Sequence, residues 1–334
     1  MSAGVTVGVS PRKETAGAAT ALRRLVSATA AAFGRERALS LAGLLGVALG
    51  SGVLAVLAAR GRYVLPEGDL YKAGTFDIAI GLYVLTLALL LPLAGFGRRG
   101  LAGWRWCMVG LALYVYAVET VQVARGLDPR FTRAGSPADQ ILGITLGLAA
   151  LGIIAVFVVL AWRFFFRRGA WADSPGGALV LTGVRYGAAA TFVGFAAGFW
   201  LSANQGSAVG ETGNLLPLHA AGFHGLQAVP LVALLSAWAG AAGTAARRRV
   251  HAAGLCWLGL CAALWWQTAA GRSVLEPSAA TAAAAACALA WLATTAAAAL
   301  AWARAGFRVQ GPRADAADPP AQVSLDQPAR ISPD

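Results

Sequence analysis

The sequence predicts an all-α fold: a polytopic membrane helical bundle of about eight transmembrane helices with both termini in the cytoplasm. The 334 residues contain eight apolar stretches, each near the roughly 20 residues that a helix needs to cross a hydrocarbon core. Backbone amides cannot stay unpaired in lipid, so a membrane-spanning segment is a helix or a closed-barrel strand. The stretches are too long for barrel strands and lack period-two alternation, which leaves helices.

The predicted spans follow one another with short connections, as expected from a hydrophobic fraction of 58% and a mean hydropathy of +0.63. In chain order they are Leu39–Ala59, Phe76–Phe96, Cys107–Ala124, Ile141–Trp162, Ala178–Leu201, Leu216–Ala239, Val250–Gln267 and Ala279–Trp302.

These spans divide the chain into three regions. Residues 1–37 form a basic cytoplasmic tail, in which 19–37 is a candidate amphipathic helix on the inner membrane surface. Residues 38–304 form the transmembrane domain. Residues 305–334 are rich in proline and aspartate and are predicted to be a disordered cytoplasmic tail. No convincing internal repeat is visible, so the sequence does not predict an inverted-repeat transporter.

The basic residues set the orientation. With the N-terminus inside, 19 of the 27 lysines and arginines fall on the cytoplasmic side and seven on the outside, while Arg185 lies within a span. This is the bias that the positive-inside rule describes, and it predicts a multi-pass protein of the cytoplasmic membrane. The same distribution explains the net charge of +12, because basic residues that border the spans can bind anionic head groups of membrane lipid, the predicted partner. Nucleic acid is excluded as a partner, because no basic soluble domain is present.

Cysteine usage gives no sign of a metal or redox centre. The four cysteines, Cys107, Cys256, Cys261 and Cys287, lie in or beside spans, and no Cys-x-x-Cys motif occurs. We interpret them as small apolar side chains that fill space in the bundle.

Polar side chains of five spans gather at one depth, the outer half of the membrane. They are Asp77 in the second span, Tyr116, Glu119 and Gln122 in the third with Arg125 just beyond, Asn204 after the fifth, His219, His224 and Gln227 in the sixth, and Gln267 in the seventh. Three tryptophans share this depth and are candidates for an aromatic wall: Trp200, Trp265 and Trp266. Polar groups are costly in a membrane, so the pattern predicts a substrate-binding cavity between helices, open to the outside or the outer leaflet.

Glu119 is the strongest candidate for a catalytic group. It shares a stripe with Tyr116 and Gln122, since the three are spaced three residues apart. Arg125 or a protonated histidine of the sixth span is the predicted cation beside it. Glu119 is either a working acid, base or ligand group, or else a structural ion pair or interhelical hydrogen bond. Asp77 is the second carboxylate, or else it caps its helix.

The two histidines of the sixth span have two interpretations. His219 and His224 are separated by about 140° around an ideal helix, so they do not share a face. Each is a candidate proton acceptor or a hydrogen-bonding group. No cofactor is predicted. Haem or a metal at these histidines is not favoured, because His251, the third histidine in the chain, begins the seventh span on the inner side.

Two motifs resemble elements of a bacterial family of multi-spanning membrane proteins that is itself uncharacterised. The first is Gln122-x-x-Arg125-Gly126 followed by Phe131, and the second is His219-x-x-Gly222-x-His224-x-x-Gln227-x-x-Pro230. Members of that family carry a Ser-His pair before the phenylalanine, where this chain has Pro129 and Arg130. The resemblance implies that the residues of both motifs form one site, and it implies no reaction.

Three functions follow from these observations. The first is a membrane-embedded enzyme that acts by acid–base chemistry, such as cation-mediated cyclisation, on an apolar, lipid-like, isoprenoid or terpenoid small molecule. The likeness to membrane-bound terpene cyclases is one of chemistry, since the chain holds no motif of theirs. The second is a transporter or channel for a small molecule or protons. The third is a haem-, quinone- or lipid-binding protein without catalysis.

Overall fold

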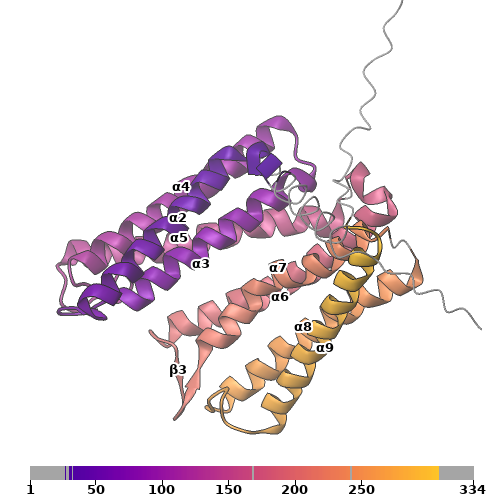
Figure 1. Cartoon of the computed structure of the whole chain (residues 1–334). Helices are drawn as coiled ribbons and strands as arrows, with labels where there is room; N and C mark the ends of the chain where they lie inside the picture. Colours follow the sequence, from indigo (N-terminus) through magenta and orange to yellow (C-terminus); the bar gives the residue numbers. More distant parts are fainter. Residues whose placement is uncertain (1–26, 28–29, 32, 168, 241–242, 308–334) are drawn as a thin grey trace, which may run out of the picture.

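The computed structural model describes residues 27, 30, 31, 33–167, 169–240 and 243–307, and within them it confirms the all-α bundle (Figure 1). The long helices are α2 (Arg37–Arg60), α3 (Leu70–Leu90), α4 (Arg98–Ala124), α5 (Pro137–Phe166), α6 (Pro175–Ala203), α7 (Leu215–Trp238), α8 (Thr244–Ala269) and α9 (Ala279–Arg304). Each predicted span corresponds to one of these helices. The tails predicted at 1–37 and 305–334 fall largely outside the described residues.

Seven of these helices are long and apolar enough to cross a membrane, which makes the chain a multi-pass membrane protein. The helix left out of the seven is α8, whose first turns carry three successive arginines, Arg247–Arg249. It packs against both α7 and α9 (Figure 1). Because α7 ends and α9 begins at opposite ends of the bundle, we infer that α8 crosses with them as the eighth helix.

Hydropathy placed the second span several residues too late. The helix α3 begins at Leu70 rather than Phe76, because the Asp69 side chain caps it by accepting hydrogen bonds from the backbone N–H groups of Tyr71 and Lys72. A proline at the other end, Pro92, converts the last turn into the short 3₁₀ helix η1 (Leu91–Ala94). Capping and proline effects are local, and an average over 20 residues does not detect them.

The structure shows an internal repeat that the sequence analysis did not predict. The helices α2–α5 form one unit and α6–α9 form a second (Figure 1). In each unit a two-stranded hairpin joins the first two helices, β1 (Tyr63–Val64) with β2 (Gly68–Asp69) and β3 (Ala208–Val209) with β4 (Gly213–Asn214). Since each unit contributes four helices, an even number, both run in the same direction and the repeat is parallel.

The two hairpins match residue for residue, with a constant offset of 145 residues. Their paired residues are Tyr63 with Asp69, Val64 with Gly68, Ala208 with Asn214, and Val209 with Gly213. The backbone N–H of Leu70 donates to the carbonyl of Arg62 at 2.9 Å, and Leu215 donates to Ser207 at 2.8 Å. The last residue of each hairpin, Asp69 or Asn214, caps the helix that follows. The same backbone geometry therefore recurs at equivalent positions.

In each unit the first two helices approach closely through glycines. A Cβ atom on Gly50 of α2 would lie 2.4 Å from the carbonyl oxygen of Gly74 on α3. In the second unit, a Cβ atom on Gly222 of α7 would lie 2.4 Å from the Cα atom of Gly194 on α6. Small residues at such contacts let helix backbones pack closely in lipid, where no hydrophobic force between helices exists.

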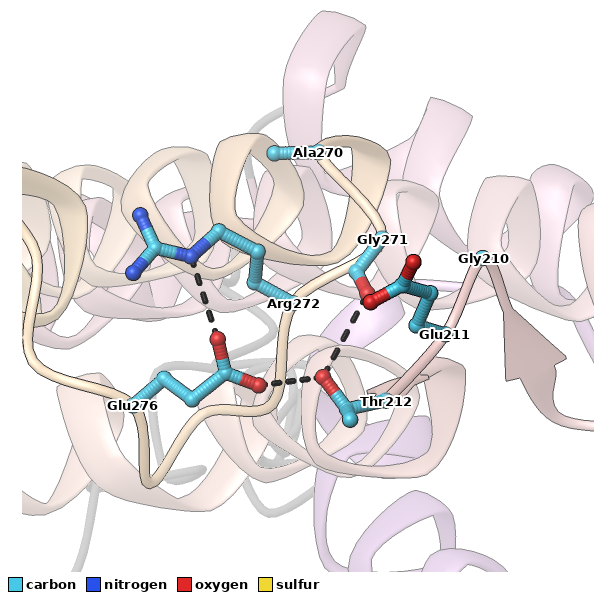
Figure 2. Close-up of a pocket in the computed structure, with 7 residues that line it drawn as sticks. All are labelled: Gly210, Glu211, Thr212, Ala270, Gly271, Arg272 and Glu276. Carbon is cyan, nitrogen blue, oxygen red and sulfur yellow. Dashed lines mark hydrogen bonds and ion pairs between the residues drawn. The ribbon is translucent and has the colours of Figure 1, made fainter.

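Each hairpin is fastened to the loop that follows the third helix of its unit, a contact that we call the clasp. In the first unit the Glu67 carboxylate accepts hydrogen bonds from the Thr132 hydroxyl at 2.6 Å and the Arg133 N–H at 3.0 Å. The equivalent of Glu67 in the second unit is Thr212, whose hydroxyl donates to Glu276 of the loop (Figure 2). The same bond is kept with the carboxylate and the hydroxyl exchanged between hairpin and loop.

An aromatic cluster joins the two units. Its rings are Tyr83 of α3, Phe157 of α5, Phe195 of α6 and Phe223 of α7. Neighbouring ring centroids are 5.2 to 6.1 Å apart, mostly edge to face. Such pairs add to the stabilisation that burial itself provides, so this cluster fixes how the units meet.

Candidate functional site

The first unit buries two carboxylates and one guanidinium together, and we call Asp77, Glu119 and Arg130 the acid cluster. Asp77 and Glu119 are both 0% exposed. One Arg130 Nη atom lies 2.9 Å from a Glu119 oxygen. Thr120, the residue after Glu119 in α4, donates its hydroxyl to Asp77 at 3.2 Å, so both carboxylates lie at the contact between α3 and α4. Such groups are expensive inside a membrane and mark a functional site unless they are fully paired.

The acid cluster is not fully paired. Asp77 accepts one hydrogen bond, from the Thr120 hydroxyl at 3.2 Å, and its other oxygen has no partner among the described residues. The first oxygen of Glu119 and the hydroxyl of Tyr116 are likewise buried without a hydrogen bond in the described part of the chain. A buried polar atom without a partner costs about 1–3 kcal/mol, so these atoms are costly for the fold.

Arg130 reaches the cluster because its loop folds back. The Asp128 side chain accepts hydrogen bonds from the backbone N–H groups of Arg130 at 2.8 Å and Phe131 at 3.0 Å, which is the geometry of an Asx turn. The guanidinium lies 4.6 Å from the ring centroid of Phe76 on α3. The ion pair and the aromatic face together hold the cation over α3 and α4.

Of the two cations predicted beside Glu119, Arg125 was wrong. Arg125 does not contact Glu119; its guanidinium binds Asp139 at 2.5 Å and Gln122 at 2.7 Å. Arg125 follows α4 at its end and turns toward the first turn of α5, where Asp139 also forms a capping box with Ser136. In the sequence, Arg130 stood out only as a departure from the Ser-His pair of the similar family, although the Asp-Pro pair before it is a turn signal.

The Gln-x-x-Arg-Gly motif is therefore part of the scaffold. Gln122 is fully buried and links Arg125 to Asp139. Gly126 has a φ of +79°, and a Cβ atom on it would lie 2.0 Å from the carbonyl oxygen of Leu65 in the first hairpin. The motif ends one helix, starts the next and leaves room for the hairpin.

Gln267 has the same scaffold role in the second unit. It lies 145 residues after Gln122, is 1% exposed, and bonds the Ser278 hydroxyl that caps α9. Asn204 ends α6 and donates to the carbonyl of Ala208 in the second hairpin. Neither residue contacts the acid cluster.

The tryptophans of the predicted aromatic wall lie on the second unit. The ring centroids of Trp200 and Trp265 are 5.5 Å apart, whereas Trp266 is 73% exposed. No ring contact or hydrogen bond among the described residues connects them to Glu119 or Asp77. They form a patch of their own, beside α6 and α8.

His219 of the second unit lies beside the aromatic cluster that joins the two units. Its Nδ1 atom lies 2.9 Å from the carbonyl oxygen of Gly194, and its ring packs 4.9 Å from Phe223. Phe223 in turn packs 5.5 Å from Tyr83 of α3, so His219 lies beside the contact between the two units. His219 is partly buried and leaves its Nε2 atom without a protein partner among the described residues.

His224 and Gln227 occupy a different place, at the contact between α3 and α7. The Gln227 amide bonds the Thr86 hydroxyl at 2.8 Å in either orientation of the amide. His224 is exposed on the protein surface, with Nδ1 3.3 Å from the Gln227 side-chain oxygen. Of the two histidines, it is His219 whose ring contacts the aromatic cluster, through Phe223.

Comparison of the two units separates scaffold from chemistry. Positions shared by both units hold the hairpin and the helix ends, as Gln122 and Gln267 do. The residues 145 positions after Asp77, Tyr116 and Glu119 are Gly222, Cys261 and Leu264. The acid cluster is therefore not required by the repeat. Among the described residues, no three histidine, cysteine, aspartate or glutamate side chains converge as a metal site requires.

Comparisons with protein-family models, with curated proteins and with solved structures found no match.

Proposed function

We propose that this protein is an integral membrane enzyme that acts on an apolar, lipid-like substrate by acid–base chemistry. The observation that supports this best is the acid cluster: two carboxylates with no exposure, incompletely paired, and absent from the equivalent positions of the second unit. Ionisable groups buried in a membrane destabilise the fold, and they are therefore expected mainly where they serve a function. An apolar substrate would reach the cluster from the bilayer itself.

The contacts favour different roles for the two carboxylates. Glu119 touches a guanidinium and is suited to remain ionised, whereas Asp77 has only a hydroxyl as donor and is suited to hold a proton. Asp77 is thus the proposed acid, and Glu119 the proposed stabiliser of positive charge. His219, whose Nδ1 atom is held by the Gly194 carbonyl while its Nε2 atom has no partner among the described residues, is the proposed acceptor of the proton released at the end.

These roles fit the isomerisation or cyclisation of an alkene. A proton passes from Asp77 to one alkene carbon, forming a C–H bond and leaving a cation on the other carbon. The cation reacts within the molecule and then loses a proton to His219. The substrate gains one proton and loses one, so no oxidant or second substrate is needed, and the proton passes from His219 back to Asp77 before the next turnover. Glu119 lowers the barrier by placing negative charge where positive charge develops.

The test compares organic extracts, by mass spectrometry, of cells that are supplied with isoprenoid precursors. The cells express the wild type, Asp77→Asn, Glu119→Gln or the control Glu211→Gln, which changes an exposed carboxylate, at equal membrane level. We expect a product in the wild type and the control that both cluster variants lack. Normal product in Asp77→Asn would refute the proposal. Identical profiles for all strains, including cells without the protein, would also refute it for this substrate class.

A transporter is the second candidate, and the parallel repeat is the observation that favours it. Transporters built from parallel repeats place their substrate near the interface between the units, where His219 packs against Phe223 of the aromatic cluster. A proteoliposome assay with an internal pH dye separates the two candidates. Proton uptake that depends on Asp77 and Glu119, with no change in lipid extracts, would replace the enzyme by a proton-coupled transporter.

A further inference from the structure

The seam between the two units contains a pocket separate from the acid cluster. It has a volume of about 260 Å³ and lies between α3 and α7. Its lining is Phe33, Leu82, Leu85, Thr86, Leu89, His224 and Gln227. Leucine and phenylalanine side chains form most of the wall, and the three polar side chains come from both units.

The polar side chains of this pocket are not all satisfied by the protein. Gln227 and Thr86 bond each other across the seam at 2.8 Å. His224 places its Nδ1 atom 3.3 Å from Gln227, but its Nε2 atom has no partner among the described residues. The imidazole is exposed on a surface that faces hydrocarbon, where water does not supply the missing bond. A bound molecule with a hydrogen-bonding oxygen would supply it.

The depth of His224 limits what that molecule can be. His224 is nine residues into α7, a helix of 24 residues, which places it about 13 Å along a helix about 36 Å long. This position lies inside a hydrocarbon core about 30 Å thick, below the level of phospholipid head groups. A charged phosphate or carboxylate at this depth would be strongly disfavoured.

We propose that the seam pocket binds a neutral, lipid-soluble molecule through a single hydroxyl or carbonyl oxygen on His224, with its hydrocarbon part against the leucines. The volume is below that of pockets for whole drug-sized ligands, so it suits a ring or a few prenyl units rather than a complete lipid. An imidazole nitrogen accepts or donates according to tautomer, so both a hydroxyl and a carbonyl fit. The site does not depend on chemistry at the acid cluster.

The experiment measures equilibrium binding to the purified full chain in nanodiscs, by thermal shift over a series of probe concentrations. The probes are farnesol, which carries a hydroxyl, a decyl-substituted benzoquinone, which carries carbonyls, and farnesene, which has a similar chain without oxygen. The pocket variants are His224→Phe and Leu82→Trp. Leu82 is 43% exposed, so the larger ring narrows the pocket without entering the core. The matched controls are Leu289→Trp on the lipid-facing side of α9 and His251→Phe, whose histidine contacts Tyr186.

We expect saturable binding of farnesol or the quinone to the wild type and to both controls, and at least about tenfold weaker binding to both pocket variants. Binding of farnesol would identify a hydroxyl as the group that His224 recognises, and binding of the quinone would identify a carbonyl. Farnesene is expected to bind at least about tenfold more weakly than farnesol or the quinone. Three results would overturn the site: no saturable binding of either oxygen-bearing probe, equal affinity in the pocket variants, or farnesene binding as tightly as both. Each of these leaves the proposed reaction at Asp77 untouched.

Discussion

The acid cluster depends on one ion pair for its charge balance. Arg130 is the cation in contact with Glu119, at 2.9 Å, and Glu119 is completely buried. Removing one partner of a buried pair leaves the other charge in an apolar surrounding, which is far costlier than removing both. The ion pair is also what distinguishes Glu119 from Asp77, whose donor is a hydroxyl.

Arg130→Gln is therefore expected to destabilise the fold by about 3 kcal/mol. The double variant Glu119→Gln with Arg130→Gln is expected to lose less unfolding free energy than Arg130→Gln alone, because neither charge of the pair is then left without its partner. Thermal unfolding in detergent measures both. Arg133→Gln, an exposed arginine of the same loop, is the control and should change little. A strictly additive double variant would show that the two side chains do not act as a pair.

Single residues show how far the sequence could locate the site. Asp77, Glu119 and His219 are identifiable because an ionisable group within an apolar run is rare. Arg130 is not, since its approach depends on a turn made by Asp128 after the helix has ended. Gln122 and Gln267 have the same composition signal as the site residues and turn out to hold helix ends. Site residues and scaffold residues can be told apart only by the side chains that each contacts in the folded protein.

At the scale of elements, each hairpin packs on the glycine that follows the third helix of its unit. Gly126 and Gly271 have φ angles of +79° and +71°, a region that favours glycine. Their surroundings differ. A Cβ atom would meet the Leu65 carbonyl oxygen at 2.0 Å in the first unit, and the Cα atom of Gly210 at 3.1 Å in the second.

Substituting alanine at these two glycines is expected to reduce the stability of the fold by unequal amounts. Gly271→Ala should cost about 1 kcal/mol for the left-handed backbone alone. Gly126→Ala should cost at least about 2 kcal/mol, because the hairpin must also move. Gly110→Ala in α4, where a Cβ atom meets nothing within 4 Å, is the neutral control. Equal losses at Gly126 and Gly271, measured by thermal unfolding, would contradict the packing described here.

The clasp makes hairpin stability depend on pH. The Thr132 hydroxyl and the Arg133 N–H, both bonded to the Glu67 carboxylate, lower the pKa of Glu67. A lowered pKa in the folded state means that the stabilisation is complete above the unfolded value of about 4.3 and is lost as pH falls through the folded value. The contribution of Glu67 to unfolding stability should therefore decline from about pH 5 downward.

Comparison with Glu67→Gln isolates this contribution, because glutamine does not titrate. The difference in melting temperature between wild type and variant is expected to shrink as pH falls below about 5. The reciprocal variant Glu67→Thr with Thr132→Glu copies the arrangement of the second unit, so it should keep the pH dependence. A difference that stays constant between pH 6 and pH 3 would exclude the clasp as its source.

The whole molecule is a parallel pair of four-helix units, and this was the level that the sequence predicted least well. Long apolar runs locate every helix, because the hydrocarbon core fixes their length. The repeat cannot be detected from apolar runs, because the two units share backbone geometry and only a few glycine, glutamine and capping positions. The clasp even exchanges its carboxylate and hydroxyl between the units. Because equivalent positions carry different side chains while the backbone geometry is the same, the two units have little sequence similarity by which to detect the repeat.

A parallel repeat places both hairpins on the same side of the membrane. In a cysteine-free background, Tyr63→Cys and Ala208→Cys are expected to react with a membrane-impermeant maleimide on intact cells. Arg98→Cys and Arg248→Cys, at the opposite ends of helices, should react only after permeabilisation, as the distribution of basic residues predicts. Labelling of the two hairpins from opposite sides would contradict the parallel arrangement.

The central claim is that Asp77 holds a proton beside an ionised Glu119–Arg130 pair, and infrared spectroscopy of the purified protein in lipid tests it most directly. A protonated buried carboxyl gives a C=O stretching band apart from the amide bands, and deuterium exchange shifts it. We predict such a band at neutral pH in the wild type and in Glu211→Gln, and its loss in Asp77→Asn. A wild type without the band, or a band that persists in Asp77→Asn, would contradict the assignment of Asp77 as the acid.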